Sequence, residues 1–173
     1  MNAMQFMDEI QQISIQASQE RSLRQQLQAQ EDVWKRIDFI IKPYKQKDNI
    51  LGDVEEIYVS LDECLANINM ILGNRYVKPL RAEAEQFRIN MLKLQNIMDA
   101  WVKLQHQWIY LENIFTAPDI RRNLVQESLK FDQVDKFFKT TMNKARKSIN
   151  PIRFLKTNGN IDEAMNLHNE TLD

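Results

Sequence analysis

A heptad repeat between Pro79 and Phe115 is the strongest pattern in the sequence. Alternating steps of four and three residues keep its mostly apolar members on one face of a helix, as in helices packed along a seam. Such a helix would be roughly 55 Å long at ~1.5 Å per residue. It needs neighbours along its whole length, so the pattern predicts an elongated bundle. The repeat consists of Leu80, Ala84, Phe87, Met91, Leu94, Met98, Trp101, Gln105 and Trp108.

Another long helix is predicted from about Met4 to Ile37, but its apolar positions change phase. The surface between Gln16 and Gln30 is mostly Gln, Arg, Ser and Glu. We therefore expect either a shift of the buried face or a break near Ser18–Ser22. One stripe holds Ile10, Ile13 and Ala17, and the other holds Leu23, Leu27, Trp34, Ile37 and Ile41.

The stretch 37–51 alternates apolar and polar residues around Pro43-Tyr44, which favours a small two-stranded hairpin, with a plain loop as the alternative. The next helix should start at Asp53. Glu56 follows three residues later and gives a variant of the capping box. Gly73-Asn74 is a natural stop for this helix.

The remaining chain predicts two further helices. Ala117-Pro118 ends the long heptad helix, because the residue before a proline avoids the helical region. A helical stripe then runs to Asn150-Pro151, and a turn at 158–160 leads into a last amphipathic helix over Ile161–Leu172. The fold class is therefore all-α: a single elongated bundle of about five helices over residues 1–173, with at most one small β-hairpin near 37–51.

The composition of the chain argues against several classes of function. Only three glycines and four prolines occur, so the elements should be few and long. A net charge of −1 argues against a nucleic-acid binder, and no apolar run approaches the ~18 residues that a membrane span needs. The N-terminus shows no signal-peptide pattern, and the single cysteine, Cys64, favours a reducing compartment.

The sequence offers no candidate active site. Phosphate-binding glycine loops, HExxH and CxxC are all missing, and His106, His168 and Cys64 lie far apart in the chain. Adjacent carboxylates such as Glu55-Glu56 point in different directions on a helix and fit solvated faces. We therefore expect no catalytic residues, no cofactor and no metal.

One basic cluster lies near the C-terminus. A solvated helix face is the simpler interpretation, and a docking patch for an acidic protein surface is the alternative. Phe137 lies beside Phe138, and both cannot face the same way, so one of them is a candidate for a second interface with a segment outside this chain. The cluster holds Lys136, Lys139, Lys144, Arg146, Lys147, Arg153 and Lys156, and the candidate partner-binding set is Phe137, Lys136, Lys139, Lys144 and Lys147.

A specific motif lies at the end of the heptad helix. It resembles the pattern W-x(3)-Q-x-x-W-x-Y-L-E-x-I-F, then D-I and F-x-x-V-D, in the N-terminal linker region of dynein heavy chains. Tyr76-Val77-Lys78-Pro79 and the stretch 13–23 resemble upstream parts of that family. Val125 replaces the family's usual proline and permits a more continuous helix. The matching residues are Trp101, Gln105, Trp108, Tyr110, Leu111, Glu112, Ile114, Phe115, Asp119, Ile120, Leu124, Glu127, Phe131, Val134 and Asp135.

The resemblance implies a mechanical function. In that family the linker is a helical rod that crosses a ring of ATPase modules and moves the tail relative to the microtubule. The nucleotide motifs of the ring lie C-terminal to the linker, and none occurs here, so the chain resembles a fragment without enzymatic activity.

The same resemblance implies partners and a location. The partners would be the remaining linker segments and ATPase ring of the same heavy chain, the dynein tail and, indirectly, microtubules, with no nucleic acid and no membrane. The location would be the cytoplasm and cytoskeleton, and the axonemal type in cilia is favoured. The expected packing residues are Trp101, Trp108, Tyr110, Phe115 and Phe131. A generic helical scaffold that binds a partner through the basic face is the alternative.

Overall fold

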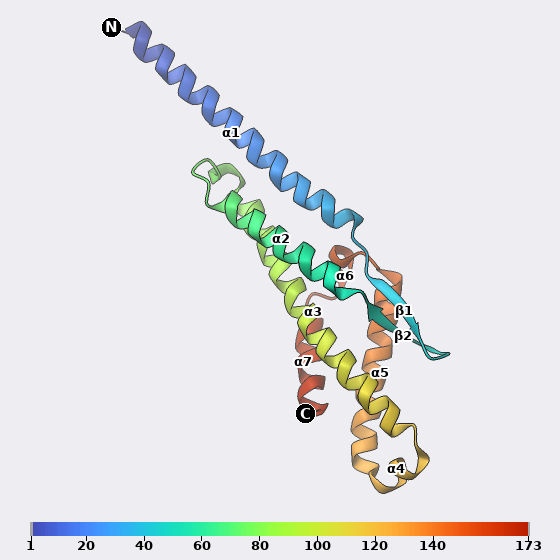
Figure 1. The fold of residues 1–173 in the computed structure, drawn as a ribbon. Helices are drawn as coiled ribbons and strands as arrows, with labels where there is room; N and C mark the ends of the chain where they lie inside the picture. Colours follow the sequence, from blue (N-terminus) through green and yellow to red (C-terminus); the bar gives the residue numbers. More distant parts are fainter. Residues whose placement is uncertain (1, 173) are drawn as a thin grey trace.

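The computed structural model describes residues 2–172 and shows a rod built almost entirely of helices (Figure 1). The all-α prediction with one small hairpin is confirmed, although the described residues form seven α-helices rather than about five. The elements are α1 (Asn2–Arg36), β1 (Ile40–Tyr44), β2 (Asp48–Gly52), α2 (Val54–Leu72), the 3-10 turn η1 (Lys78–Leu80), α3 (Arg81–Phe115), α4 (Pro118–Asn123), α5 (Val125–Lys147), α6 (Pro151–Thr157) and α7 (Ile161–Leu172).

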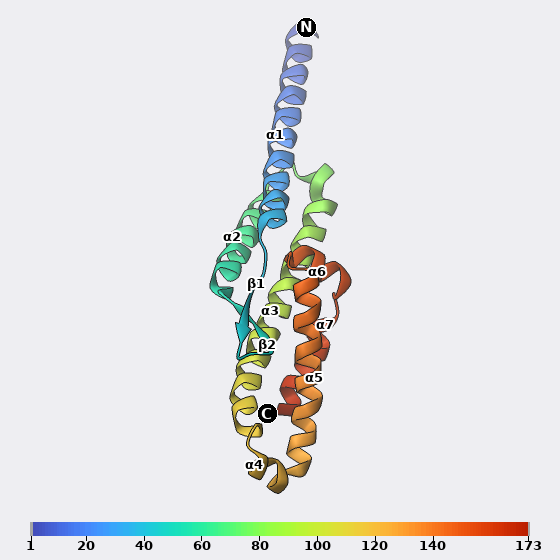
Figure 2. The same ribbon diagram turned by 90° about the vertical axis from the view of Figure 1, so that its right-hand side faces the viewer.

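Helix α3 is the axis of the rod. Helices α2, α5 and α7 pack around it, with α6 and the hairpin also in contact (Figure 2). Because α3 has neighbours on more than one side, burial extends beyond the predicted heptad to Ile97, Ala100 and Leu104. The predicted long helix is therefore confirmed, and the fold places nearly the whole core along it.

Helix α1 continues without interruption through Ser18–Ser22, so of the two alternatives expected there the break is wrong. Only its C-terminal half packs, where Leu23 and Leu27 join a small core with the α2–α3 corner. Its N-terminal half projects beyond that corner (Figure 1), and Ile13 there is 67% exposed. The change of phase in the sequence thus marks the point where tertiary contacts end, not the point where the helix ends.

The hairpin forms as predicted, with β1 and β2 antiparallel and Tyr44 opposite Asp48 next to the turn. The predicted capping box at the start of α2 is wrong. Asp53 adopts a left-handed conformation, with φ of 49°, and its side chain makes no helix cap. Its carboxylate instead accepts a hydrogen bond of 2.9 Å from Lys42 of β1, which ties the hairpin to the helix start. The predicted stop at Gly73 is confirmed.

The chain reverses direction at α4, so that α5 returns along α3. A break remains at Leu124, with φ of −122° and ψ of 63°, and the more continuous helix permitted by Val125 is therefore wrong. Arg121 holds this corner: its Nε donates to the Phe115 carbonyl at 2.6 Å, and its guanidinium forms two hydrogen bonds with Asp132. The reversal is what brings α5 into register with α3.

The end of α5 is fixed to the hairpin and to α1. The Phe39 amide donates to the Ile149 carbonyl at 2.6 Å. The Asn150 side chain caps α6 by accepting from Ile152 and Arg153, and its Nδ2 donates to the Trp34 carbonyl at 2.8 Å. Proline at the first position of α6 separates this short helix from α5. The end of the preceding helix near Asn150-Pro151 was predicted, but the short helix that follows was not.

Candidate functional site

Three aromatic pairs run along the rod, and we call them the aromatic ladder. On α3 its members lie seven residues apart, and each stacks on an aromatic ring from another helix. The stacked pairs are Trp101–Phe154 at 5.2 Å, Trp108–Phe138 at 4.4 Å and Phe115–Phe131 at 5.2 Å between ring centroids. Phe131 and Phe138 are themselves seven apart on α5, so the heptads of two antiparallel helices meet in register.

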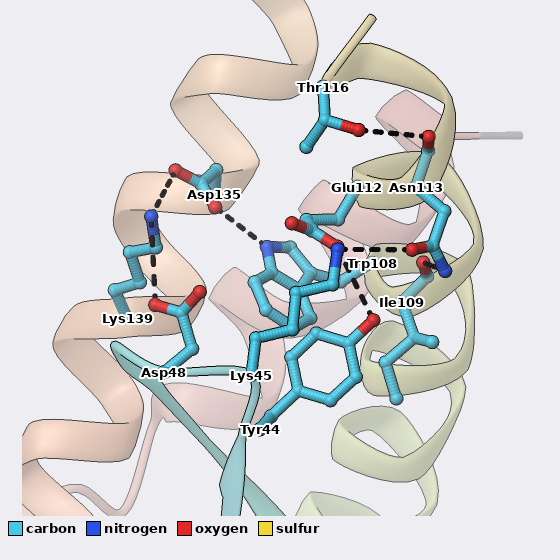
Figure 3. A network of polar contacts seen from close by, with 10 residues as sticks. All are labelled: Tyr44, Lys45, Asp48, Trp108, Ile109, Glu112, Asn113, Thr116, Asp135 and Lys139. Atoms are coloured by element: carbon cyan, nitrogen blue, oxygen red, sulfur yellow. Dashed lines mark hydrogen bonds and ion pairs between the residues drawn. The ribbon is translucent and has the colours of Figure 1, made fainter.

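Trp108 is the centre of a junction between α3, α5 and the hairpin (Figure 3). Its ring is fully buried, stacks on Phe138 and meets the edge of Tyr44 from β1 at 5.4 Å. A buried indole N–H needs a hydrogen-bond acceptor. The Asp135 carboxylate of α5 provides it at 2.8 Å, which fixes both the depth and the rotation of the tryptophan.

Asp135 also begins an ion-pair chain to the hairpin turn. Lys139 lies 3.1 Å from Asp135 and 3.8 Å from Asp48 (Figure 3). Desolvation opposes the charge of Lys139, but its hydrogen bond with Asp135 and the nearby carboxylates of Asp48 and Glu112 outweigh it and raise the pKa of the ammonium. Lys139 therefore serves an internal contact rather than a free docking face.

Glu112 of α3 binds residues on the β1 side of the hairpin turn. Its carboxylate accepts from Lys45 Nζ at 2.7 Å and from the Tyr44 hydroxyl at 3.3 Å. The hydrogen bond with Glu112 is the main cause that raises the pKa of the Lys45 ammonium. Lys45 also donates to Asn113 at 3.1 Å, so two successive residues of α3 bind the turn (Figure 3).

Gln105 is the polar member of the heptad, and the structure explains its place. Its side-chain amide pairs with the backbone of Leu51 in β2 through hydrogen bonds of 2.7 Å and 2.8 Å. The amide thus satisfies one N–H and one C=O of a strand edge that would otherwise face α3 without partners. Gln105, Trp108 and Glu112 together join the hairpin to α3.

Trp101 forms a second aromatic cluster near the middle of the rod. Phe39 meets Trp101 edge-on at 5.2 Å and Phe154 at 5.5 Å, so the three rings enclose one another. The indole nitrogen of Trp101 is buried without a hydrogen-bond partner in the described part of the chain. Packing alone, without a polar anchor, therefore holds this tryptophan in place.

The other predicted motif residues lie apart from these contacts. Tyr110 is 68% exposed, so its predicted packing role is wrong among residues 2–172. It falls on the outer face of α3 because it lies only two residues from Trp108 on the helix. Leu111 and Ile114 are half-buried. Asp119 is exposed and pairs only with Arg122 one turn away, at 3.3 Å.

The predicted partner-binding residues do not form one surface. Phe137 is half-buried against His168 of α7, with ring centroids 4.4 Å apart, so its contact lies within this chain. Burial lowers the pKa of that imidazole. Lys136, Lys144 and Lys147 are exposed and form no ion pair among residues 2–172, whereas Lys139 is engaged as described.

The charges of the junction have structural roles. The one thiol of the chain, Cys64, lies outside the junction on α2 and is buried. Burial raises the pKa of the Cys64 thiol to about 11, which outweighs the opposing effect of the neighbouring Trp34 side chain and keeps the thiol protonated. No group of three or more His, Cys, Asp or Glu side chains is placed to hold a metal ion in residues 2–172. Over the same residues, no helix combines the length and apolarity needed to cross a membrane.

Sequence reasoning missed the partners that build the junction. It matched Asp135 and Tyr44 to family patterns but gave them no contact, and it assigned no role to Lys45. The Trp108–Asp135 contact spans 27 residues and the Lys45–Glu112 contact spans 67. No local spacing signals contacts of that range, although a buried tryptophan on a heptad seam does signal that an acceptor is needed.

The fold and the junction define a helical structural element in which one long helix is fastened to its neighbours from end to end. Comparison with known proteins gives the family. The family description "Dynein heavy chain, N-terminal region 2" matches residues 1–173, and the chain belongs to the dynein heavy chain family.

Relatives with curated names agree with this assignment and with the axonemal type. The chain is 36% identical to human dynein axonemal heavy chain 6 over 170 residues, which cover 97% of this chain and 4% of that protein. It is 32% identical to human dynein axonemal heavy chain 3 over 82% of this chain and 4% of the relative. Rat dynein axonemal heavy chain 12 matches at 29% identity over 100% of this chain and 6% of its own length. The chain thus spans only a small fraction of these relatives.

Proposed function

We propose that this chain is a non-catalytic segment of the mechanical linker of a dynein heavy chain. It would form part of the lever that couples ATP-driven changes in the ring to movement along microtubules. The aromatic ladder is the observation that carries the proposal, because it fastens α3 to α5 and α6 at three places along the rod.

Stiffness follows from the register of the ladder. Bending or sliding α3 against α5 would unstack Trp108 from Phe138 and Phe115 from Phe131 at the same time, and would break the hydrogen bond to Asp135. Close-packed interiors shift between discrete arrangements and do not deform continuously. A rod fastened in this way transmits displacement from one end to the other, which is what a lever requires.

The partners follow from the same proposal. They are the remaining linker segments and the ATPase ring of the parent heavy chain, the dynein tail and, through the motor, the microtubule. The axonemal heavy chains among the relatives favour the ciliary axoneme as the location.

Distance measurements between the two ends of the rod test its stiffness. Spin labels at Met70→Cys and Leu129→Cys, both exposed positions, report the span in a Cys64→Ala background. We expect a single narrow distance distribution that Phe138→Ala broadens. Phe6→Ala on the projecting half of α1 is the matched control and should leave the width unchanged. A broad distribution in the unmodified ladder would contradict a stiff rod.

A motility experiment tests the lever itself. In a dynein heavy chain that carries this segment, Phe138→Ala should slow microtubule gliding while ATP turnover continues, because a softened lever uncouples the ring from movement. Phe138→Leu keeps an apolar side chain in the same place and should retain most of the speed. If Phe138→Ala broadens the distance distribution but leaves the gliding speed unchanged, the proposal is wrong.

A further inference from the structure

A cleft of about 830 Å³ lies where the C-terminal end of α1, the first half of α3 and the α5–α6 corner meet. Figure 2 shows α6 beside α3, just past the end of α1, and both helices contact α6. The cleft shares none of its lining residues with the Trp108 junction. Its size is in the range of sites that hold a ligand, roughly 300–1,000 Å³.

Cations from three different elements line this cleft: Lys35 of α1, Lys147 at the end of α5, and Arg153 and Lys156 of α6. None of the last three forms an ion pair within residues 2–172. Lys35 has only an exposed contact of 3.6 Å with Asp32 on its own helix. Like charges that converge without partners repel each other, so an anionic group in the cleft would be attracted.

Apolar side chains also line the cleft, and we call Phe87, Ile149 and Ile152 its apolar floor. Phe87 and Ile152 are half-buried, and Ile149 is 42% exposed although it is a large aliphatic side chain. Protein–protein interfaces also combine apolar contact surface with charged groups. Glu31 of α1 and Asp38, which follows α1, also line the cleft, so two carboxylates share it with four cations.

We propose that this cleft docks an acidic segment of a separate protein, with an apolar side chain on the Phe87–Ile149–Ile152 floor and carboxylates toward the cations of the α5–α6 corner. An extended segment fits better than a compact phosphate, because it can cover the apolar floor while its carboxylates stay near the cations of the α5–α6 corner and away from Glu31 and Asp38. Those two carboxylates suit a peptide, whose backbone N–H groups are donors. The proposal does not rest on the mechanical function.

This site differs from the basic face that the sequence suggested. Lys136 and Lys144 do not line the cleft, and Lys139 is held by Asp135 and Asp48. Only Lys147 belongs to both sets, while Lys35 comes from a helix more than a hundred residues earlier in the chain. The convergence of these cations is a product of the fold.

Fluorescence anisotropy with a labelled peptide tests the proposal on the 173-residue chain. The probe is a phenylalanine flanked on each side by three acidic residues. We expect saturable binding that Lys147→Glu with Lys156→Glu weakens by about tenfold, since each exposed ion pair contributes about two- to fivefold. Lys136→Glu with Lys144→Glu makes the same change of charge outside the cleft, also with one substitution in the last turn of α5, and should leave binding nearly unchanged.

A second pair of variants tests the apolar floor. Ile149→Ala should weaken binding of the phenylalanine peptide severalfold, and it should have no effect on a peptide with glycine in place of phenylalanine. Leu129→Ala removes an exposed aliphatic side chain outside the cleft and is the control. Circular dichroism on every variant shows that the fold is retained.

Four results would overturn the proposal. They are no saturable binding by the unmodified chain, equal weakening by both charge pairs, competition by inorganic tripolyphosphate at the same affinity as the peptide, and a dimer in sedimentation that Lys147→Glu with Lys156→Glu abolishes. The third result would assign the cleft to a simple anion, and the fourth would assign it to a second copy of this chain.

Discussion

Helices α1 and α3 have the same length, 35 residues, and opposite surroundings. Helix α3 is buried along its seam from Ala84 to Phe115, whereas α1 is buried only from Leu23 to Trp34. Yet α1 carries a seam of its own: Phe6, Ile10, Ile13 and Ala17 recur in steps of four and three residues. Equal periodicity therefore does not mean equal burial.

The difference teaches which part of a helix depends on tertiary contacts. The seam of α1 drifts slowly around a straight helix, because 3.6 residues per turn does not match a seven-residue repeat. Past the α2–α3 corner no neighbour within residues 2–172 follows that drift. On α3, by contrast, each ladder position stacks on an aromatic ring from another helix, so other segments of this chain cover the apolar seam of α3.

The largest expected effect comes from a substitution at the centre of the aromatic ladder. Trp108→Ala should lower the free energy of unfolding by about 3–5 kcal/mol, because it leaves a cavity against Phe138 and removes the donor to Asp135. Urea titration followed by circular dichroism measures it. Tyr110→Ala, two residues away on the exposed face, is the control and should change stability by less than about 0.5 kcal/mol. A small loss for Trp108→Ala would mean that α3 is not the axis of the core.

A smaller loss is expected where α1 is fastened to the rod. Asn150→Ala should cost about 1–3 kcal/mol, since the side chain both caps α6 and donates to the Trp34 and Ile37 carbonyls. Asn143→Ala on the exposed face of α5 provides the comparison. If the two variants melt at the same temperature, the Asn150 contacts do not hold α1 in place.

The projecting half of α1 should tolerate the loss of its apolar seam. Ile10→Ala with Ile13→Ala should shift the free energy of unfolding by less than about 0.5 kcal/mol, because neither side chain is buried. Hydrogen exchange should be faster for amides 4–18 than for those of α3, since an isolated helix is marginal in water. Strong protection of 4–18 would show that this half is covered in solution.

The smallest effect is a pH dependence at the Phe137–His168 contact. Burial lowers the pKa of His168 in the folded state, so the unfolded chain takes up the proton first as the pH falls. This group therefore destabilises the fold as the pH drops below about 6.5, and it has no effect well above that value. His168→Gln should reduce the slope of stability between pH 7 and 5, as measured by urea titration at each pH.

Much of the fold could be predicted from local pattern. The heptad of α3, the hairpin around Pro43 and the last helix all follow from periodicity and chain breakers, and these signals lie within single segments. The errors at Asp53 and Leu124 have one cause. Both residues adopt conformations fixed by distant groups, Lys42 at the hairpin and the return of α5 along α3.

The junction was only half predictable. The motif identified Gln105, Trp108 and Glu112 as special positions, but it could not separate them from Tyr110, which lies on the outer face. Their partners Leu51, Asp135 and Lys45 come from segments brought together by the reversal at α4 and by the hairpin.

By itself the sequence determined the family, the helical class and the seams along which helices pack, because these depend on residue order over a few turns. Only the tertiary structure decided which seam is filled, which charges are paired and where unpaired cations converge. Those outcomes depend on how helices separated by dozens of residues in the sequence lie against one another. The free energy that selects this arrangement comes from many contacts between distant residues, which a short stretch of sequence does not include.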